Sequence, residues 1–218
     1  MAIKSGETTY HQAKRGIVQN GLVLNLDAAV DASYSGGTTW RDLEGGNNGT
    51  LTNGPTFDAG NGGSIVFDGS DDYVDCGNPS ISTGKLTTSA WVKINTTKFQ
   101  HVLDSSSNSW HLAILDSNRP YLYNGSTYGG GAQVLSNLTW YMITGVQGTT
   151  LDMYVNGVLS QSVASNVNVS TNTLHIGRWQ NGGRNLDGDI ASAQIYNRAL
   201  TATEVLQNYN ATRHRFGV

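Results

Sequence analysis

The sequence predicts an all-β protein built as a two-sheet antiparallel sandwich, with one short helix near the C-terminus. Three observations support this fold class. Charged residues make up only 13% of the 218 residues and glycine occurs 27 times, whereas a helical protein would contain more Glu, Lys and Ala. Short segments of alternating apolar residues recur, and Gly- and Asn-rich turns separate them. Only residues 202–209 follow a helix start signal.

The strands are predicted from period-two alternation of apolar side chains. Leu22, Leu24 and Leu26 alternate with Val23 and Asn25, which is typical of a strand with one buried face. Turns at residues 147–150 and 156–157 predict hairpins. The other expected strands cover residues 64–74, 90–94, 102–103, 110–115, 119–123, 140–146, 151–155, 158–159, 173–176 and 190–196.

The predicted helix begins with a capping box. In Thr201-Ala-Thr-Glu204, the first and last side chains can each satisfy a free backbone N–H of the other residue. Val205, Leu206 and Tyr209 would share one face of the helix. We expect this face to cover one end of the sandwich.

Three motifs, taken together, resemble a known family. The first is the turn, strand and helix at residues 186–206. The second consists of the segments 64–74 and 89–94, and the third of the segments 140–143 and 151–157. Their order and spacing resemble laminin-G-like, concanavalin A-like jelly-roll domains. The resemblance covers residues 21–212 and implies a jelly-roll sandwich, with residues 1–20 as an N-terminal arm and residues 213–218 as a basic tail. Members of this fold bind glycans, build assemblies or hydrolyse sugars, so the site must decide the function.

Enzymatic activity is not expected. Glycosidases on this fold carry a strand-borne Glu-x-Asp-x-x-Glu run, but the only glutamates here are Glu7, Glu44 and Glu204, and none belongs to such a run. His111 and His175 lie within strand patterns and are interpreted as ordinary sheet histidines. A Ser-His-Asp triad assembled from distant positions stays open, although no motif indicates one.

Calcium is the one cofactor that the sequence suggests. Asp71 and Asp72 lie in one Gly-containing turn and Asp187 and Asp189 in another, where carboxylates offer the oxygen ligands that calcium prefers. The resemblance implies a calcium ion near the sandwich rim, but relatives continue with Asp-Glu where this chain has Ala-Ser at residues 191–192. The favoured alternative is that these aspartates cap turns.

A glycan site is predicted where aromatic rings occur beside hydrogen-bond donors. Trp179 enters a Gly-rich loop together with Asn181 and Arg184, while Tyr121 and Tyr123 precede an Asn-Gly turn. Sugar binding needs such an aromatic platform with polar groups beside it. The alternative is that Trp179 packs against the edge of the sandwich.

The charge is unevenly distributed along the chain. Each end carries +2, which leaves −7 on the body of a chain whose net charge is −3. The ends are therefore interpreted as assembly arms, with ordinary solvated termini as the alternative. An acidic body argues against nucleic acid as a partner, and no apolar run is long enough to span a membrane. The arm residues are Lys4, Lys14, Arg15, Arg213, Arg215 and Phe216.

The C-terminal motif narrows the expected role. Residues 187–200, with 207–213 and 215–217, resemble laminin-G-like proteins of tailed bacteriophages. The resemblance implies a virion structural protein at the surface of a head or tail, most simply a capsid decoration or cement protein. Its partners would be the major capsid protein or another virion protein and further copies of itself, for example in a trimer. The alternative is a carbohydrate-binding adhesin, on a phage fibre or tail or as a free lectin, that recognises host-surface glycans.

Overall fold

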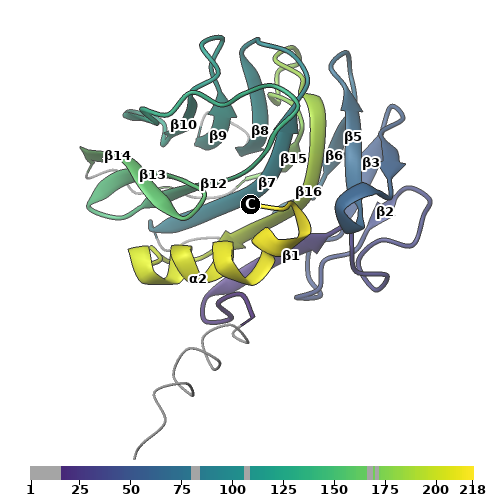
Figure 1. Ribbon diagram of the computed structural model, residues 1–218, viewed down its shortest axis with the longest axis horizontal. Helices are drawn as coiled ribbons and strands as arrows, with labels where there is room; N and C mark the ends of the chain where they lie inside the picture. Colours follow the sequence, from purple (N-terminus) through teal and green to yellow (C-terminus); the bar gives the residue numbers. More distant parts are fainter. Residues whose placement is uncertain (1–15, 80–83, 106–108, 166–168, 170–171) are drawn as a thin grey trace, which may run out of the picture.

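The computed structural model describes residues 16–79, 84–105, 109–165, 169 and 172–218. They form two antiparallel sheets, which we call sheet A and sheet B, and a helix that lies along the side of sheet A (Figure 1). This architecture confirms the predicted all-β sandwich with one C-terminal helix. Lys4, Lys14 and Arg15 of the predicted arm lie outside the described residues.

Sheet A has eight strands in the order β14-β13-β12-β7-β16-β5-β4, and β1 also pairs with β16. Two long central strands, β7 and β16, hold it together. The strands of sheet A are β1 (Leu22–Asp27), β4 (Thr56–Asp58), β5 (Ser64–Asp68), β7 (Leu86–Ile94), β12 (Trp140–Gln147), β13 (Thr150–Val155), β14 (Val158–Ala164) and β16 (Asp187–Tyr196).

Sheet B also has eight strands, in the order β11-β10-β9-β8-β15-β6-β3-β2. Consecutive hairpins join β8, β9 and β10, and the pairing of β15 with β8 and β6 brings distant segments of the chain side by side. The strands of sheet B are β2 (Thr39–Trp40), β3 (Gly49–Thr52), β6 (Tyr73–Asp75), β8 (Gln100–Ser105), β9 (Trp110–Ile114), β10 (Pro120–Tyr123), β11 (Tyr128–Gly130) and β15 (Leu174–Ile176).

The main hydrophobic core fills the space between the two sheets. Trp40 and Trp110 are fully buried in it, together with leucine, isoleucine and valine side chains from both sheets. Cys76 is free and buried in the same core. Because side chains alternate along a strand, the residues between these core positions point to the outer face of each sheet.

The outer face of sheet A is covered by helix α2 (Ala202–Thr212) and forms a second hydrophobic cluster (Figure 1). Both hydrogen bonds of the predicted capping box are present. Val205 is buried against sheet A as predicted, but Leu206 is exposed, and the buried neighbour on that face is Asn208. Asn208 is buried in place of Leu206 because the Asn208 side chain hydrogen-bonds to the backbone N–H of Val18 and to the hydroxyl of Tyr196.

Residues 16–20 pack against the body of the domain. Val18 is buried in the cluster under α2, and its carbonyl accepts a hydrogen bond from the Tyr196 hydroxyl. Residues 16–20 therefore contribute to the packing of the domain, ahead of its first strand at Leu22.

The described part of the basic tail also packs on the domain. Phe216 stacks on Trp91 with ring centroids 4.0 Å apart, and Arg215 forms an ion pair of 2.8 Å with Asp27. Arg213 donates a hydrogen bond to the carbonyl of Val218. The side chains of the predicted arm residues Arg215 and Phe216 are thus engaged within the chain, and docking of the tail on a neighbour stays a prediction.

Within the described ranges, no helix has the length and apolar character needed to cross a bilayer.

Candidate functional site

The outer face of sheet B carries a group of aromatic and histidine side chains. On β9, Trp110, Leu112 and Ile114 point into the core, so His111 points outward. The pairing of β9 with β10 places Tyr123 opposite His111. Tyr121 lies two residues earlier on the same strand and shares this outer face. Strand pairing thus gathers His111, Tyr121 and Tyr123, from β9 and β10, on one face.

A cavity of about 430 Å³ opens on this face. Its lining is mainly aromatic, and its only formally charged lining group at neutral pH is a guanidinium. The lining residues are Phe99, His111, Leu115, Tyr121, Tyr123, Tyr128, Trp179 and Arg184. We call this cavity the aromatic pocket.

One wall of the aromatic pocket is the loop between β15 and β16. The guanidinium of Arg184 lies 4.1 Å from the ring centroid of Phe99 and 4.6 Å from that of Trp179. The backbone of this loop is tied to β8, because the carbonyl of Arg184 accepts from the N–H of His101 at 2.9 Å. The cation and two rings therefore form a supported stack, a favourable arrangement for a guanidinium.

The opposite wall consists of tyrosines on β10 and β11. Tyr123 and Tyr128 have ring centroids 4.7 Å apart, and the ring of His111 lies 4.8 Å from that of Tyr123. Tyr128 is 64% exposed, whereas Tyr121 is buried beneath it. The pocket therefore presents accessible ring surface at its rim and buried polar atoms at its base.

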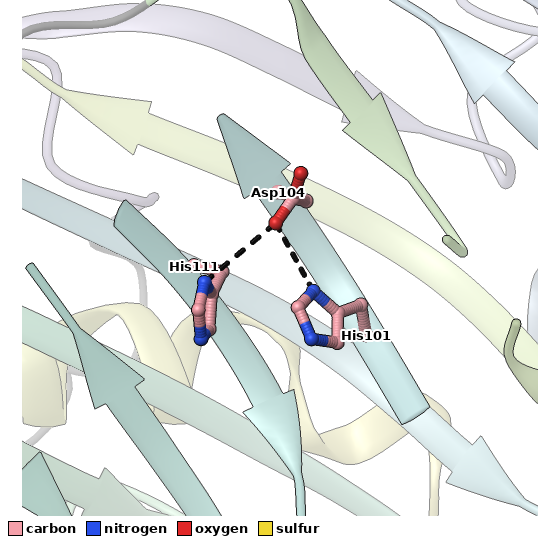
Figure 2. A group of neighbouring side chains, drawn as sticks. All are labelled: His101, Asp104 and His111. Atoms are coloured by element: carbon pink, nitrogen blue, oxygen red, sulfur yellow. Dashed lines mark hydrogen bonds and ion pairs between the residues drawn. The ribbon is translucent and has the colours of Figure 1, made fainter. Parts of the chain in front are cut away.

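The base of the aromatic pocket is a cluster of His101, Asp104 and His111 (Figure 2). Residues three apart in a regular strand point to opposite faces. A register shift between His101 and Leu103 alters this relation, and His101 and Asp104 share the outer face. His101 Nδ1 lies 3.0 Å and His111 Nδ1 3.7 Å from the same carboxylate oxygen, Oδ1 of Asp104.

Burial governs the charges in this cluster. Desolvation, with a smaller contribution from the positive charge of Arg184, lowers the pKa of His101 to about 3. Desolvation also lowers the pKa of His111 to about 3 and raises that of Asp104 to about 6. Both imidazoles are thus neutral at pH 7, and the Asp104 carboxylate accepts the Nδ1–H of His101.

Hydrogen bonds hold the remaining polar atoms of the cluster in place. His111 Nε2 bonds the Tyr121 hydroxyl at 2.8 Å, and the N–H of Gln180 donates to Oδ2 of Asp104 at 3.1 Å. His101 Nε2 and His111 Nδ1 are buried without a hydrogen-bond partner. Buried nitrogens without a partner are uncommon in proteins and need a physical explanation.

Four of the five predicted glycan residues line the aromatic pocket together. Tyr121, Tyr123, Trp179 and Arg184 meet there, although they come from β10 and from the loop before β16. Asn181 is exposed and does not belong to the lining. Trp179 is half-buried and approaches His101 at 6.3 Å between ring centroids, so it both packs on the sheet and faces the pocket.

Sequence reasoning missed part of this site. His111 does lie in a strand, as predicted, but it also lines the pocket. Phe99 and the pair His101 and Asp104 were not expected. The alternation of Tyr121 and Tyr123 was a usable signal for one shared face, whereas the shifted register of β8 leaves no pattern in the residues.

The four predicted calcium ligands do not meet at one point. Asp187 accepts hydrogen bonds from Asn95 and Thr96 at 3.1 and 2.8 Å. Asp189 is buried and forms an ion pair of 3.1 Å with Lys93. Local partners therefore engage the second pair, and neither of its carboxylates joins the group formed by Asp68, Asp71 and Asp72.

Asp71 and Asp72 lie close to Asp68 in the turn after β5. Asp72 Oδ2 accepts the N–H of Asp68 at 3.0 Å, and Asp68 Oδ1 accepts the N–H of Ser70 at 2.8 Å. Through these hydrogen bonds Asp68 and Asp72 cap the turn, which is the role that the sequence favours. Calcium at this turn stays a prediction.

The chain has the architecture of a lectin-like sandwich, and its family is known. Residues 68–206 match the family model of the concanavalin A-like lectin/glucanases superfamily. The match spans more than half of the chain, so the chain belongs to this superfamily, as its motifs predict. A search of curated proteins finds no match.

Solved structures share this fold at low sequence identity. Domain 4 of AbnA, a GH43 extracellular arabinanase from Geobacillus stearothermophilus solved with arabinotriose, is 17% identical, with a TM-score of 0.69 over 88% of this chain and 100% of that chain. Trypanosoma rangeli sialidase with the inhibitor DANA is 14% identical, with a TM-score of 0.69 over 93% of this chain and 36% of the sialidase.

The receptor binding domain of botulinum neurotoxin C/D mosaic serotype is also similar. It is 17% identical, with a TM-score of 0.67 over 87% of this chain and 51% of that domain. At these identities the likeness establishes the fold alone.

Proposed function

We propose that this chain is a non-enzymatic carbohydrate-binding protein whose sugar site is the aromatic pocket on sheet B. The observation that carries the proposal is the gathering of Tyr123, Tyr128, Trp179 and Arg184 around one cavity of about 430 Å³. A pocket lined by aromatic rings with a few placed polar groups is the usual form of a small-ligand site. The domain with arabinotriose shares the fold, which is compatible with the proposal.

The pocket offers both kinds of contact that a sugar ring needs. The exposed face of Tyr128 can pack on the apolar C–H face of a pyranose or furanose. Arg184 is exposed at the other wall, where its guanidinium can donate to hydroxyl or carboxylate oxygens. Because Arg184 is the charged lining group, we expect sugars with an acidic substituent to bind more tightly than neutral ones.

The lining favours binding over hydrolysis. Retaining and inverting glycosidases use two carboxyl groups on either side of the scissile bond. None of the eight residues that line the aromatic pocket is an aspartate or a glutamate. Asp104 lies below the pocket and is engaged by His101 and the N–H of Gln180. We therefore expect no turnover of glycans bound here.

A glycan array followed by calorimetry tests this proposal. The best ligand of the array is titrated into the wild type and into Tyr128→Ala, which removes exposed ring surface with little effect on the fold. Loss of one sugar–aromatic contact of about 1.4 kcal/mol weakens binding about tenfold. Arg184→Ala should weaken acidic sugars more than neutral ones.

Phe57→Ala is the matched control, because Phe57 is an exposed aromatic residue on β4 of the other sheet. The Phe57→Ala variant should bind the glycan with the same affinity as the wild type. An array without any binding, or equal affinities for wild type and both pocket variants, would contradict the proposal.

Assembly on a virion, as a capsid decoration protein or a tail adhesin, is the second candidate function. The observation that favours it is the open edge of sheet A. On the described part of the chain no strand pairs with the outer side of β14, where Val158 and Leu159 are 67% and 50% exposed. An exposed apolar strand edge offers unpaired backbone groups with which another chain can pair. Self-association through β14, for example in a trimer, would cover it.

The copy number of this chain in purified particles tests the virion role. Quantitative mass spectrometry should give a number comparable to the major capsid protein for a decoration protein and a few copies for a tail adhesin. Absence from particles would refute the role. An arm truncation should remove only residues 1–15, because Val18 packs under α2 and its loss would destabilise the domain itself.

A further inference from the structure

The cluster below the aromatic pocket contains ligand atoms that sugar binding does not use. His101, Asp104 and His111 are 0%, 1% and 5% exposed. Nothing in the proposed sugar contacts requires two buried imidazoles around one buried carboxylate. The cluster therefore needs an explanation of its own.

The two imidazoles converge on a single point. Figure 2 shows that both Nδ1 atoms are directed at Asp104, on the side of each ring that faces the carboxylate. Two ligands bound to one tetrahedral ion through bonds of about 2.05 Å lie about 3.4 Å apart. The separations of 3.0 and 3.7 Å from Asp104 Oδ1 lie on either side of this value.

Hydrogen bonds from Tyr121 and Gln180 engage atoms of the cluster that would not bind a metal, and they orient the side chains of His111 and Asp104. Tyr121 binds His111 on Nε2, which leaves Nδ1 without a hydrogen-bond partner. The N–H of Gln180 binds the other carboxylate oxygen of Asp104. Outer partners of this kind fix the orientation of metal ligands in proteins.

His101 can adopt the tautomer that a metal needs. Its Nδ1–H now bonds Asp104, while its Nε2 is buried without a partner. Transfer of the proton to Nε2 frees Nδ1 and breaks no other hydrogen bond.

We propose that His101, Asp104 and His111 bind one divalent transition-metal ion of the zinc type. Two imidazole nitrogens and one carboxylate oxygen suit zinc, whereas calcium and magnesium prefer oxygen ligands alone. Three protein ligands leave a position for water. This site differs from the calcium site predicted at the aspartate turns in both its residues and its metal.

Metal titration of the purified chain, stripped with a chelator and free of sugar, tests the proposal. Calorimetry with zinc should give one ion per chain, and cobalt should give the absorption bands of a tetrahedral nitrogen and oxygen site. Asp104→Asn and His111→Asn should each weaken zinc binding by about tenfold or more. Circular dichroism checks that each variant is folded. If one variant is unfolded, zinc binding by the other is enough for the test.

The control is His214→Asn, an exposed histidine in the turn at residues 213–215 that is not part of the cluster. It should bind zinc like the wild type. No binding at millimolar zinc, binding unchanged in both cluster variants, or equal loss in His214→Asn would overturn the proposal. Because no sugar is present, these outcomes are independent of whether the aromatic pocket binds glycans.

Discussion

Replacement of Phe216 by alanine should destabilise the domain, because the tail packs on sheet A. The Phe216 side chain is only 9% exposed and stacks on Trp91, with Trp140 4.9 Å away between ring centroids. Burial of a phenylalanine contributes about 2–3 kcal/mol, and aromatic pairs add about 0.5–1.5 kcal/mol each. Since a short turn can partly collapse into the space, we expect a loss at the lower end of the range for such substitutions, about 3 kcal/mol.

Urea unfolding followed by tryptophan fluorescence measures this loss. In a domain of this size, 3 kcal/mol corresponds to a decrease in Tm of about 6–12 °C. The matched control is Val218→Ala, which truncates an exposed side chain two residues away and should change stability by less than about 0.5 kcal/mol.

A loss below about 1 kcal/mol in Phe216→Ala would refute this reasoning. It would mean that the ring does not pack on Trp91 in solution and that the tail is free to serve as the assembly arm expected from its charge. The same experiment thus decides between a tail that belongs to the domain and one that docks elsewhere.

Three further substitutions test the remaining packing and ion-pair arguments. Glu204→Gln keeps an acceptor for the capping box but removes the ion pair with Arg198, whose Nη2 lies 2.6 Å from Glu204 Oε1, and should cost about 1 kcal/mol at pH 7. Hydrogen bonding to Arg198 lowers the pKa of Glu204 to about 2, so the stabilisation is complete above about pH 4.5, and the difference from wild type in urea unfolding should shrink as the pH falls towards and through 2. Persistence of the full difference at pH 2 would contradict this. Asn208→Ala leaves the buried N–H of Val18 unpaired and should lower the free energy of unfolding by about 1–3 kcal/mol, whereas a neutral effect would show that residues 16–20 do not pack there. Gly49→Ala places a methyl group 2.5 Å from Val74 Cγ1 and should cost about 1–3 kcal/mol in thermal unfolding; unchanged Tm would argue against this contact.

The fold was predictable because its signals are local. Alternating side chains identify strands such as Leu22–Asp27, and the Thr201 and Glu204 capping box identifies the start of α2. Both depend on residues within a few positions of one another. Even here the helix face was partly wrong, because the burial of Asn208 depends on Val18, 190 residues away.

The site was predictable only in part because it depends on strand pairing. The chemistry of Trp179 and Arg184 indicated sugar binding, and Tyr121 and Tyr123 were identified as a second group. The two groups share one cavity because the loop before β16 packs on β8, where the N–H of His101 donates to the carbonyl of Arg184. No sequence pattern encodes that contact.

The cluster of His101, Asp104 and His111 was not predictable for a related reason. Spacings of three and seven residues match no metal motif, and a regular strand would place His101 and Asp104 on opposite faces. The register shift in β8 brings them together. Irregular pairing of this kind is set by the surrounding sheet and not by the local residues.

The location of the bound glycan tests the central claim most directly. We would record amide and indole NMR spectra of the chain during titration with the best ligand of the array. The account predicts that the largest shift changes occur at Tyr128, the Trp179 indole N–H and Arg184, while α2 is unaffected. Changes confined to another surface, such as the aspartate turn at residues 68–72 or the β14 edge, would contradict it and move the sugar site away from sheet B.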